Sequence, residues 1–312
     1  MNTYTIICAA HSFTEPDATV IGELTEAGHR VLLPKTIEEL TAMLPEADGI
    51  IAGQQPYTAD MMRSAKKLKV ISVYGVGCDK IDLSFAHQVG IVVTNTPGAN
   101  NESVADLAIA LMLAAARRIP EMDALIREGR TTRLVGIEMA GATLGVIGTG
   151  RIGKGVIRRS HGFDMGLLCY DAYPDEEYVK IYGGKYVDMD TLLRESDFIT
   201  IHAPLTDKTR NLIGEGEFKK MKPRAIIVNT ARGGIIDEDA LYRALTTGEI
   251  AAAGLDTTVG FVKDSPLRQL PNCVLLPHAG ASTFTSLERM ARFSVRNLLE
   301  VLGTGSCKAR VN

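Results

Sequence analysis

Short apolar runs alternate with amphipathic stretches along the first hundred residues. Five apolar runs are expected to form β-strands, at residues 4–10, 30–33, 49–52, 70–74 and 91–94. The stretches 18–27 and 59–67 have apolar residues at helical spacing, and Thr58 stands where the second of these helices needs an N-cap. Because strands that are apolar throughout need cover on both faces, this pattern predicts an α/β unit with a parallel sheet between two layers of helices.

The pattern changes at residue 101. Residues 101–117 are expected to form one long helix, rich in Ala and Leu, capped by Asn101 and almost without polar positions after Asp106. A helix that is apolar nearly all round is usually buried, often between domains or subunits. A second series of apolar strands follows, at residues 143–148, 167–171, 198–202, 225–229, 251–256 and 273–276, and a closing helix spans residues 283–302. The chain is therefore predicted to be an α/β protein of two doubly wound domains.

Length and composition agree with two globular domains in a reducing compartment. The chain has 312 residues, of which 46% are hydrophobic and 23% charged. A net charge of −3 without a long basic run argues against nucleic-acid binding. The short apolar start lacks basic residues, which argues against a signal peptide or a membrane span. Five cysteines without C-x-x-C pairs favour free thiols over disulfides or a metal site, and hence a cytoplasmic location.

A glycine-rich motif, G-T-G-R-I-G at residues 148–153, follows one of these strands directly and opens a predicted helix. In this context Gly148 allows the tight turn, Gly150 lets the backbone approach a pyrophosphate, and Gly153 lets helix and strand pack closely. The N-terminus of the helix then faces the phosphates. Without this context the same residues would form only a glycine-rich turn. The motif therefore predicts a dinucleotide site in the second domain.

An acidic residue lies where such a site needs one. Asp171 ends the next predicted strand, 18 residues after Gly153. From this place a carboxylate accepts hydrogen bonds from an adenosine ribose. The residues that follow, Ala172, Tyr173 and Pro174, include no arginine for a 2′-phosphate, which the carboxylate itself would repel. NAD is therefore predicted rather than NADP, and a carboxylate that only caps a helix is the alternative.

Two further residues suit the chemistry of hydride transfer to a 2-keto acid. That reaction needs a cation for the substrate carboxylate and an acid for the forming alkoxide. Arg232 lies in N-T-A-R-G-G at 229–234 and His278 in P-H-A-G at 277–280, and both motifs follow apolar strands. Singly, Arg232 could be a surface ion pair and His278 an ordinary loop histidine. Because ligands bind at the carboxyl ends of strands in such sheets, their shared position favours function.

Seven motifs in order make the chain resemble the D-isomer-specific 2-hydroxyacid dehydrogenase family over essentially its whole length. Besides 148–153, 229–234 and 277–278, they are G-V-G-C-D-K-I-D at 75–82, N-T-P-G-A-N-N-E-S-V at 95–104, H-A-P-L-T at 202–206 and G-L-D at 254–256. The resemblance implies a flavodoxin-like substrate domain, residues 1–100 plus 284–312, with an inserted Rossmann NAD-binding domain, residues 101–283. It also implies a homodimer and an active site in the cleft between the domains.

The resemblance assigns roles position by position. Arg232 binds the carboxylate and carbonyl of the substrate, His278 is the acid–base, and the backbone around Val76 and Gly77 receives the carboxylate from the other domain. The cofactor-binding residues that it implies are Val76, Gly148, Gly150, Arg151, Ile152, Gly153, Asp171, Ala203, Pro204, Thr209, Thr230, Asp256 and Gly280. Arg151 and Ile152 are expected at the pyrophosphate, Ala203 and Pro204 on the adenine side, and Thr230 and Asp256 near the nicotinamide.

One family feature is missing from the loop after G-L-D. The family places a glutamate five residues after the aspartate of that motif, where it hydrogen-bonds the catalytic histidine. Position five is Phe261 here, and Asp264 is the only carboxylate between residues 257 and 269. Three interpretations stay open: a reductase whose histidine lacks this partner, an unusual substrate facing an apolar wall, or an NAD-binding sensor with little activity. Val259, Phe261 and Val262 would form that wall.

The loop expected to face the substrate carries no cation. Residues 52–58 read A-G-Q-Q-P-Y-T, whereas relatives that recognise phosphorylated substrates have arginines here. Gln54, Gln55 and Tyr57 could bind a neutral polar group or be plain loop residues. We therefore expect an NAD-dependent oxidoreductase acting on a small, unphosphorylated 2-hydroxy or 2-keto acid. A 3-phosphoglycerate dehydrogenase-like enzyme is the enzymatic alternative.

Overall fold

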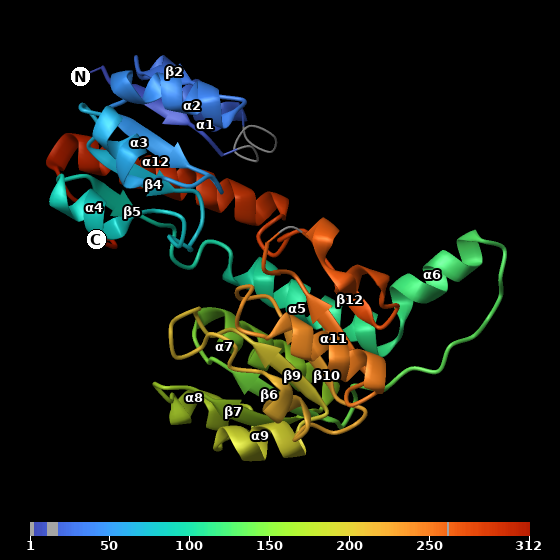
Figure 1. The fold of residues 1–312 in the computed structure, drawn as a ribbon. Helices are drawn as coiled ribbons and strands as arrows, with labels where there is room; N and C mark the ends of the chain where they lie inside the picture. Colours follow the sequence, from blue (N-terminus) through green and yellow to red (C-terminus); the bar gives the residue numbers. More distant parts are fainter. Residues whose placement is uncertain (1–2, 11–17, 261) are drawn as a thin grey trace. The chain divides into compact units, whose positions relative to one another are not determined.

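The chain forms two compact α/β units. The computed structural model describes residues 3–10, 18–260 and 262–312. Contacts within the chain group Met1–Asn100 with Ala281–Asn312 as one unit and Asn101–Gly280 as the other. In Figure 1 the first unit contains the blue and cyan segments and the red C-terminal helix, and the second contains the green to orange segments. Each unit has a parallel sheet, so the predicted fold class is confirmed.

The first unit has the flavodoxin-like strand order. Its five-stranded sheet is ordered β2-β1-β3-β4-β5, and every pair is parallel. The strands are β1 (Thr5–Cys8), β2 (Arg30–Leu32), β3 (Gly49–Ala52), β4 (Val70–Val73) and β5 (Val92–Thr94). The helices are α1 (Ala18–Glu26), α2 (Ile37–Met43), α3 (Ala59–Ser64), α4 (Leu83–Gln88) and α12 (Phe284–Thr304), with a 3₁₀ turn η2 (Leu44–Glu46).

The C-terminal helix α12 completes the core of this unit. It packs against β3, β4 and β5, and its Leu298 is fully buried in the same apolar cluster as Ile6 and Val70. The hydroxyl of Ser72 on β4 donates to the carbonyl of Ser294 on α12 at 2.8 Å. These contacts explain how residues more than two hundred positions apart in the sequence form one folded unit.

The second unit has the Rossmann strand order. Its seven-stranded sheet is ordered β12-β11-β10-β9-β6-β7-β8 and is parallel throughout. The strands are β6 (Thr143–Ile147), β7 (Gly166–Tyr170), β8 (Lys185–Tyr186), β9 (Phe198–Ile201), β10 (Ile226–Asn229), β11 (Ala252–Leu255) and β12 (Cys273–Leu275). The order reverses between β6 and β9, and open α/β sheets bind ligands at such a switch point, beyond the carboxyl ends of the strands.

The helices of the second unit cover both faces of this sheet. They are α5 (Asn101–Ala116), α6 (Ile119–Arg127), α7 (Arg151–Ser160), α8 (Glu176–Ile181), α9 (Met189–Glu195), α10 (Glu215–Phe218) and α11 (Glu238–Thr247), with 3₁₀ turns η3 (His161–Phe163), η4 (Val262–Asp264) and η5 (Pro266–Gln269). The apolar helix α5 packs on α7, β10 and β11 and is buried in the core of the second unit. No helix among the described residues is both long and apolar enough to cross a membrane.

The apolar strands lie where the sequence predicted them, within one or two residues at each end. The N-cap at Thr58 is confirmed, because its side chain accepts a hydrogen bond from the backbone N–H of Met61. The cap at Asn101 is wrong, since Asn101 is itself the first residue of α5. Strand β8 was not predicted, because two residues, one of them a lysine, are too short a run to show periodicity.

A half-buried histidine, His202, follows the central strand β9. The ring of His202 is hydrogen-bonded to the hydroxyl of Thr200 at 2.9 Å, and the hydroxyl of Thr230 lies 3.4 Å from its other nitrogen. Burial lowers the pKa of His202 to about 3 from the ordinary value of 6.5. The imidazole is therefore neutral in the folded protein at physiological pH.

The lowered pKa of His202 predicts a loss of stability in acid. Below pH 6.5 the unfolded chain binds a proton at His202 that the folded chain does not bind until about pH 3. The free energy of unfolding should therefore fall by up to about 1.4 kcal/mol for each pH unit in this window. Urea unfolding of wild type and His202→Gln from pH 7 to pH 4.5 measures this contribution.

The variant should lose less stability than wild type over the same range. His161→Gln, at an exposed histidine of the same unit, is the matched control and should follow wild type. Parallel curves for wild type and His202→Gln would contradict a His202 that stays neutral in the folded protein.

Candidate functional site

The glycine-rich turn leaves no room for side chains at two positions and open space at a third. Gly148 has a φ of 92°, and a Cβ there would lie 2.6 Å from the backbone nitrogen of Ala203. A Cβ on Gly153 would lie 2.1 Å from the carbonyl oxygen of Gly148. Gly150, which precedes α7 as its N-cap, has no atom within 4 Å of such a Cβ. The turn is thus closed on its protein side and open beside Gly150.

The first turn of α7 faces this open space. Arg151 is exposed and Ile152 half-buried at the start of the helix. The first N–H groups of any helix have no partner within the helix and carry the positive end of its dipole. A pyrophosphate therefore suits this position, as the sequence predicted from Gly148, Gly150 and Gly153.

Asp171 lies beside the glycine-rich turn. It follows β7, and its Oδ2 atom accepts hydrogen bonds from the backbone N–H of Thr149 at 2.5 Å and the Thr149 hydroxyl at 3.0 Å. Its Oδ1 atom accepts from the backbone N–H of Tyr173 at 2.8 Å. Tyr173 is 88% exposed. The structure therefore places Asp171, which is predicted to bind the ribose, next to the glycine-rich turn, which is predicted to bind the pyrophosphate.

The segment after β9 is held by a threonine. The hydroxyl of Thr209 donates to the carbonyl of Pro204 at 2.6 Å and accepts from the backbone N–H of Thr206 at 2.7 Å. Ala203 lies against Gly148, as the close approach above shows. Ala203, Pro204 and Thr209 thus form one loop next to the glycine-rich turn.

The loop that carries Arg232 is fixed by Asn229, the last residue of β10. The amide oxygen of Asn229 accepts from the backbone N–H of Ala231 at 2.9 Å, and its amide nitrogen donates to the carbonyl of Arg232 at 2.8 Å. Asn229 is 1% exposed, whereas Arg232 is half-buried. Sequence reasoning passed over Asn229, although a polar residue at the end of an apolar strand was a visible signal.

Gly233 connects this loop to the next one. A Cβ on Gly233 would lie 2.4 Å from the carbonyl of Thr258, in the loop that follows β11. The two loops are therefore in backbone contact directly beside Arg232. A side chain at position 233 would force them apart.

Asp256 fixes the loop that carries His278. The carboxylate is 1% exposed and accepts from the backbone N–H groups of Ala279 at 2.7 Å and Gly280 at 2.9 Å. Burial raises its pKa, while these two bonds and the charge of His278 lower it. The carbonyl of Gly280 in turn accepts from the hydroxyl of Ser103 on α5 at 2.7 Å. Both oxygens of Asp256 are thus bound within the protein, and its place near the nicotinamide stays a prediction.

His278 itself is exposed and has an unusual backbone. Its φ of 60° lies in the left-handed region, which only a few per cent of non-glycine residues adopt. Such conformations persist where surrounding contacts enforce them, and they cluster at functional sites. The bonds from Asp256 to the next two residues are the contacts that enforce it here.

Arg232, Asp256 and His278 follow three neighbouring strands. Arg232 comes three residues after β10, Asp256 directly after β11, and His278 three residues after β12. Because β10 pairs with β11 and β11 with β12, all in parallel, these residues share the carboxyl edge of one sheet. Neighbouring strands lie about 4.8 Å apart. Thr230, expected near the nicotinamide, is 6% exposed and faces His202 on the adjacent strand end.

In the first unit, the G-V-G loop follows β4. Gly75 has a φ of 146°. The carbonyl of Val76 accepts from the side-chain amide of Asn95 at 2.8 Å, and Asn95 is in turn held by the amide of Asn297 through a 2.9 Å bond. This bracing turns the carbonyl of Val76 toward Asn95 and holds the loop that includes Gly77.

In the loop after β3, Tyr57 was expected to face a substrate or to be a plain loop residue, and the structure shows otherwise. Tyr57 is 1% exposed and belongs to the apolar core of the first unit. It therefore does not offer its side chain to a substrate, and that reading of Tyr57 is wrong. The sequence could not show this, because whether a loop tyrosine faces the core depends on how the loop folds back over the sheet.

The loop that lacks the family glutamate is held by another carboxylate. Glu238, in the first turn of α11, accepts a hydrogen bond from the backbone N–H of Val259 at 2.6 Å. Burial raises the pKa of Glu238, and the Val259 bond lowers it. Val259 is 60% exposed. Phe261, which occupies the glutamate position, lies outside the described residues, so the predicted apolar wall is described only at Val259.

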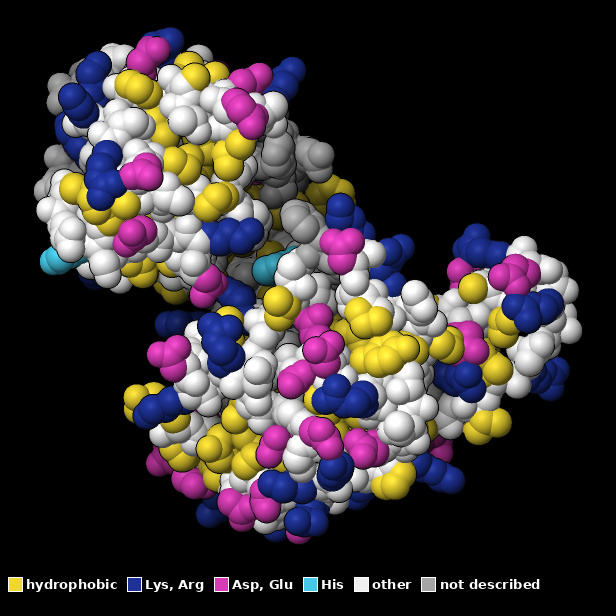
Figure 2. Space-filling model, viewed as in Figure 1, with side chains coloured by type: hydrophobic (Ala, Val, Ile, Leu, Met, Phe, Trp, Pro, Cys, Tyr) yellow, Lys and Arg dark blue, Asp and Glu magenta, His cyan; other side chains and the backbone are white. Residues whose placement is uncertain are grey.

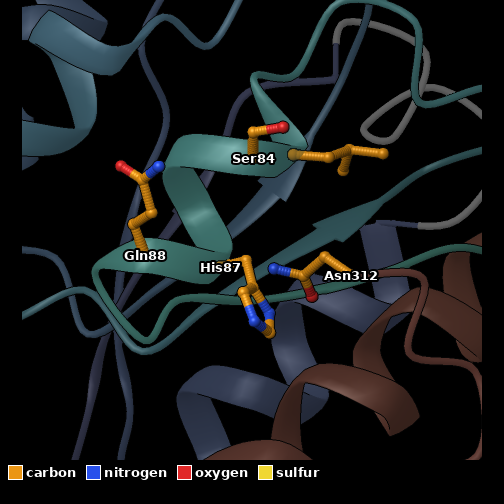
Figure 3. A pocket seen from close by; sticks show the side chains of 5 residues that line it. Ser84, His87, Gln88 and Asn312 are labelled. Atoms are coloured by element: carbon orange, nitrogen blue, oxygen red, sulfur yellow. The ribbon is translucent and has the colours of Figure 1, made fainter.

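Two cavities lie away from these residues or at their margin. One of about 480 Å³ is formed in the first unit by Leu83, Ser84, His87, Gln88 and Asn312, and Figure 3 shows Ser84, His87 and Gln88 projecting from α4. None of its lining residues belongs to the predicted site. A second, of about 390 Å³, lies between α11 and the loop after β11 and includes Glu238, Val259 and Asp264.

The distribution of charged side chains and of possible metal ligands indicates no further site among the described residues. On the face shown in Figure 2, basic and acidic side chains are intermingled over each unit. Within the described ranges, no group of three or more His, Cys, Asp or Glu side chains is placed to hold a metal ion.

The residues present fit a dinucleotide. Three features lie around one turn: open space beside Gly150, the N-terminus of the ten-residue helix α7, and the carboxylate of Asp171. These are the groups that a pyrophosphate and an adenosine ribose need.

Comparison with known proteins agrees with this assignment. The family model described as "D-isomer specific 2-hydroxyacid dehydrogenase, NAD binding domain" matches residues 109–280. A D-3-phosphoglycerate dehydrogenase of Archaeoglobus fulgidus is 48% identical over 254 residues, which cover 79% of this chain and 48% of that protein. The match thus spans about half the length of that relative. A hydroxypyruvate reductase of Thermotoga maritima is 42% identical over 276 residues, covering 85% of this chain and 88% of the relative.

Solved structures show the same architecture. A glyoxylate reductase from Paecilomyes thermophila superposes with a TM-score of 0.87 at 31% identity and covers 100% of this chain and 99% of its own. The resemblance found in the sequence is therefore confirmed. The chain belongs to the D-isomer-specific 2-hydroxyacid dehydrogenase family, and its second unit contains the NAD-binding domain of that family.

Proposed function

We propose that the chain catalyses reversible hydride transfer between NAD(H) and a small, unphosphorylated 2-keto or 2-hydroxy acid. The observation that carries this proposal is the row of Arg232, Asp256 and His278 at neighbouring strand ends of the NAD-binding sheet. A fixed cation and a histidine at one edge supply what reduction of a 2-keto acid requires of the protein.

The reaction balances with these groups. Reduction converts R–CO–COO⁻, NADH and one proton into R–CHOH–COO⁻ and NAD⁺. The cofactor supplies the hydride when bound, and it is taken up by the carbonyl carbon. Arg232 binds the substrate carboxylate and polarises the carbonyl, and the imidazolium of His278 gives its proton to the carbonyl oxygen as that oxygen becomes an alkoxide. In the reverse direction neutral His278 accepts the hydroxyl proton.

The remaining residues of the proposed site bind and orient the cofactor and the substrate. Arg151 and Ile152 contact the pyrophosphate together with Gly148, Gly150 and Gly153. Asp171 binds the adenosine ribose, Ala203, Pro204 and Thr209 border the adenine side, and Thr230, Asp256, Gly280 and Val76 border the nicotinamide. The backbone of Val76 and Gly77 receives the substrate carboxylate. Support for the last role comes from the braced G-V-G loop.

An unphosphorylated substrate is favoured because the segment 52–58 contains no Lys or Arg. Identity to a D-3-phosphoglycerate dehydrogenase keeps that activity as the enzymatic alternative. An NAD(H)-binding sensor is the alternative that the missing glutamate motivates. NADH oxidation with a panel of 2-keto acids, including glyoxylate, hydroxypyruvate, pyruvate and 3-phosphohydroxypyruvate, separates the three. Turnover of none of them would contradict an oxidoreductase.

A homodimer is part of the proposal. Helix α6 has no buried residue, although Ile119, Met122 and Ile126 form an apolar stripe along it. Ile119 and Ile126 are 50% and 55% exposed, and Val135 in the following segment is 89% exposed. Figure 1 shows α6 projecting from the rest of the second unit. A nine-residue helix is marginal in water without packing, so a second copy of the chain is the proposed cover.

A reducing, cytoplasmic location is proposed on the state of the cysteines. All five cysteines lie in the described part of the chain, and none of them is in a disulfide there. Burial raises the pKa of the Cys8 and Cys169 thiols to about 12, so both stay protonated and unreactive. A chain rich in free thiols is typical of a reducing compartment.

Replacement of Arg232 by lysine should abolish efficient turnover. A guanidinium binds a carboxylate through two parallel bonds, which an ammonium cannot reproduce. Arg232→Lys is therefore expected to lower kcat/KM roughly 100-fold for the best keto acid, with NADH binding nearly unchanged. Arg243→Lys, at an exposed arginine of α11, is the control and should behave as wild type. Near-normal turnover of Arg232→Lys would make Arg232 a structural residue.

Restoring the family glutamate should shift the pH dependence. A carboxylate beside an imidazole favours its protonated form. In Phe261→Glu the reduction rate should therefore persist to higher pH than in wild type, and oxidation should begin at higher pH. pH–rate profiles in both directions measure this, with Val259→Glu as a control two residues away. If Phe261→Glu is folded and active and its profiles superimpose on those of wild type, the hypothesis that His278 lacks a carboxylate partner is contradicted.

If α6 forms the dimer interface, one substitution in its apolar stripe should convert the dimer to monomers. Ile126→Glu places a charge in the apolar stripe of α6 and should convert the protein to monomers at micromolar concentration, measured by sedimentation velocity. Ile181→Glu, at a residue of α8 that is 73% exposed, should leave the mass unchanged. A wild-type protein that sediments as a monomer would contradict the proposed dimer.

A further inference from the structure

The G-V-G loop after β4 is held through two successive backbone carbonyls. The carbonyl of Gly75 accepts from the backbone N–H of Thr96 at 2.9 Å, and the carbonyl of Val76 accepts from the side-chain amide of Asn95 at 2.8 Å. Both donors belong to the segment that directly follows β5. The two carbonyls therefore turn toward the same neighbouring segment.

This arrangement fixes the direction of two N–H groups. A peptide bond is planar and almost always trans, so its N–H points away from its carbonyl. The N–H groups of Val76 and Gly77 belong to the two peptides just described, and both therefore point away from the segment after β5. Val76 and Gly77 are exposed, and neither N–H donates to an acceptor within the described part of the chain. Successive N–H groups that point to one side form a concave site for an anion.

The loop would not keep this orientation by itself. Gly75 has a φ of 146°, and Gly75 and Gly77 together give an exposed loop two residues without a side chain. Such residues let the peptides between them rotate easily. The bond from Thr96 comes from the main chain, whereas the bond to the carbonyl of Val76 comes from a side chain. The orientation of the second peptide therefore depends on the amide of Asn95.

Asn95 is in turn anchored by the C-terminal part of the chain. Its carbonyl accepts from the side-chain amide of Asn297 on α12 at 2.9 Å, and its backbone N–H donates to the carbonyl of Ala309 at 3.2 Å. The backbone N–H of Val311 continues this pairing by donating to the carbonyl of Val93 on β5 at 2.9 Å. Asn297 is 2% exposed, so its bond to Asn95 is shielded from water. Helix α12 and the segment after it thus hold the residue that holds the loop.

We propose that Asn95 and Asn297 are positioning residues, which turn the N–H groups of Val76 and Gly77 outward as a pair for the carboxylate of the keto acid. This inference rests on the proposed function, which supplies that ligand. Neither asparagine has to touch the substrate. The carboxylate carries the same charge before and after hydride transfer, so the pair binds it equally in the ground state and the transition state. Losing the pair should therefore raise KM and leave kcat nearly unchanged.

Asn95→Ala tests the first step. It removes the amide that holds the carbonyl of Val76 and places no charge beside the substrate. With the best keto acid among glyoxylate, hydroxypyruvate, pyruvate and 3-phosphohydroxypyruvate, KM should rise at least about tenfold, because bonds to a charged acceptor are misdirected. The kcat and the dissociation constant of NADH should stay within about twofold of wild type. An unchanged KM, or a fall in kcat alone, would overturn the inference.

Asn297→Ala tests the second step. Asn95 keeps its amide in this variant but loses one anchor, so KM should rise by a smaller factor, about threefold. In the double variant, KM should equal that of Asn95→Ala alone, because Asn297 acts only through Asn95. Increases that multiply in the double variant would overturn this dependence, and so would a KM that Asn297→Ala leaves unchanged.

Asn272→Ala is the matched control. The amide of Asn272 donates to the carbonyls of Leu245 and Ala251, at 3.3 and 3.1 Å. Asn272 is half-buried like Asn95, but it directly precedes β12 and so lies at the amino edge of the second sheet, opposite the proposed site. The KM of this variant should stay within about twofold of wild type. A rise comparable to that of Asn95→Ala would show a general effect of lost amide bonds and overturn the inference.

The outcomes separate the inference from the proposed function. Wild-type protein that turns over none of the four keto acids would overturn the proposed function itself. Turnover by wild type, together with an unchanged KM in Asn95→Ala, would overturn only the positioning role of the two asparagines.

Discussion

The loops at the carboxyl edge of the second unit's sheet depend on how one buried carboxylate, Asp256, is hydrogen-bonded. Asp256 is 1% exposed, and its two oxygens accept the backbone N–H groups of Ala279 and Gly280. A buried carboxylate without such bonds would be strongly destabilising, so this arrangement is hard to change. The same two bonds hold the backbone next to His278, whose φ of 60° is costly for a residue with a side chain. Satisfying Asp256 therefore also places the proposed acid–base.

The other loops at this edge are also held by side chains that bond to backbone groups. Asn229 accepts from the N–H of Ala231 and donates to the carbonyl of Arg232. Thr209 donates to the carbonyl of Pro204, and Glu238 accepts from the N–H of Val259. Side chains that bind backbone groups fix a loop without occupying the space above it, which stays available for ligands. This also accounts for the loop after β11. Glu238 on α11 accepts from its Val259, and its Thr258 lies close to Gly233.

Much of the fold could be predicted from local patterns, and the misses have local causes. Most strands of both sheets are short and mainly apolar, which marks them as central parallel strands whatever their neighbours. The two-residue strand β8 has no such pattern and exists because it pairs with β7. The prediction for Tyr57 failed because a tyrosine can serve a loop or a core, and only the packing of the first unit decides which.

The sequence by itself determined the longer strands, the glycine-rich turn and the positions of Asp171, Arg232 and His278 after strands, because each follows from residues adjacent in the chain. Only the tertiary structure decided which polar groups meet. Thr149 and Tyr186 are 37 residues apart, and Ser103 and Gly280 are 177 apart. Their hydrogen bonds depend on strand order and on the turn of each loop. Hydrophobic periodicity specifies which face of an element is buried, but it does not specify which distant donor will satisfy a given acceptor.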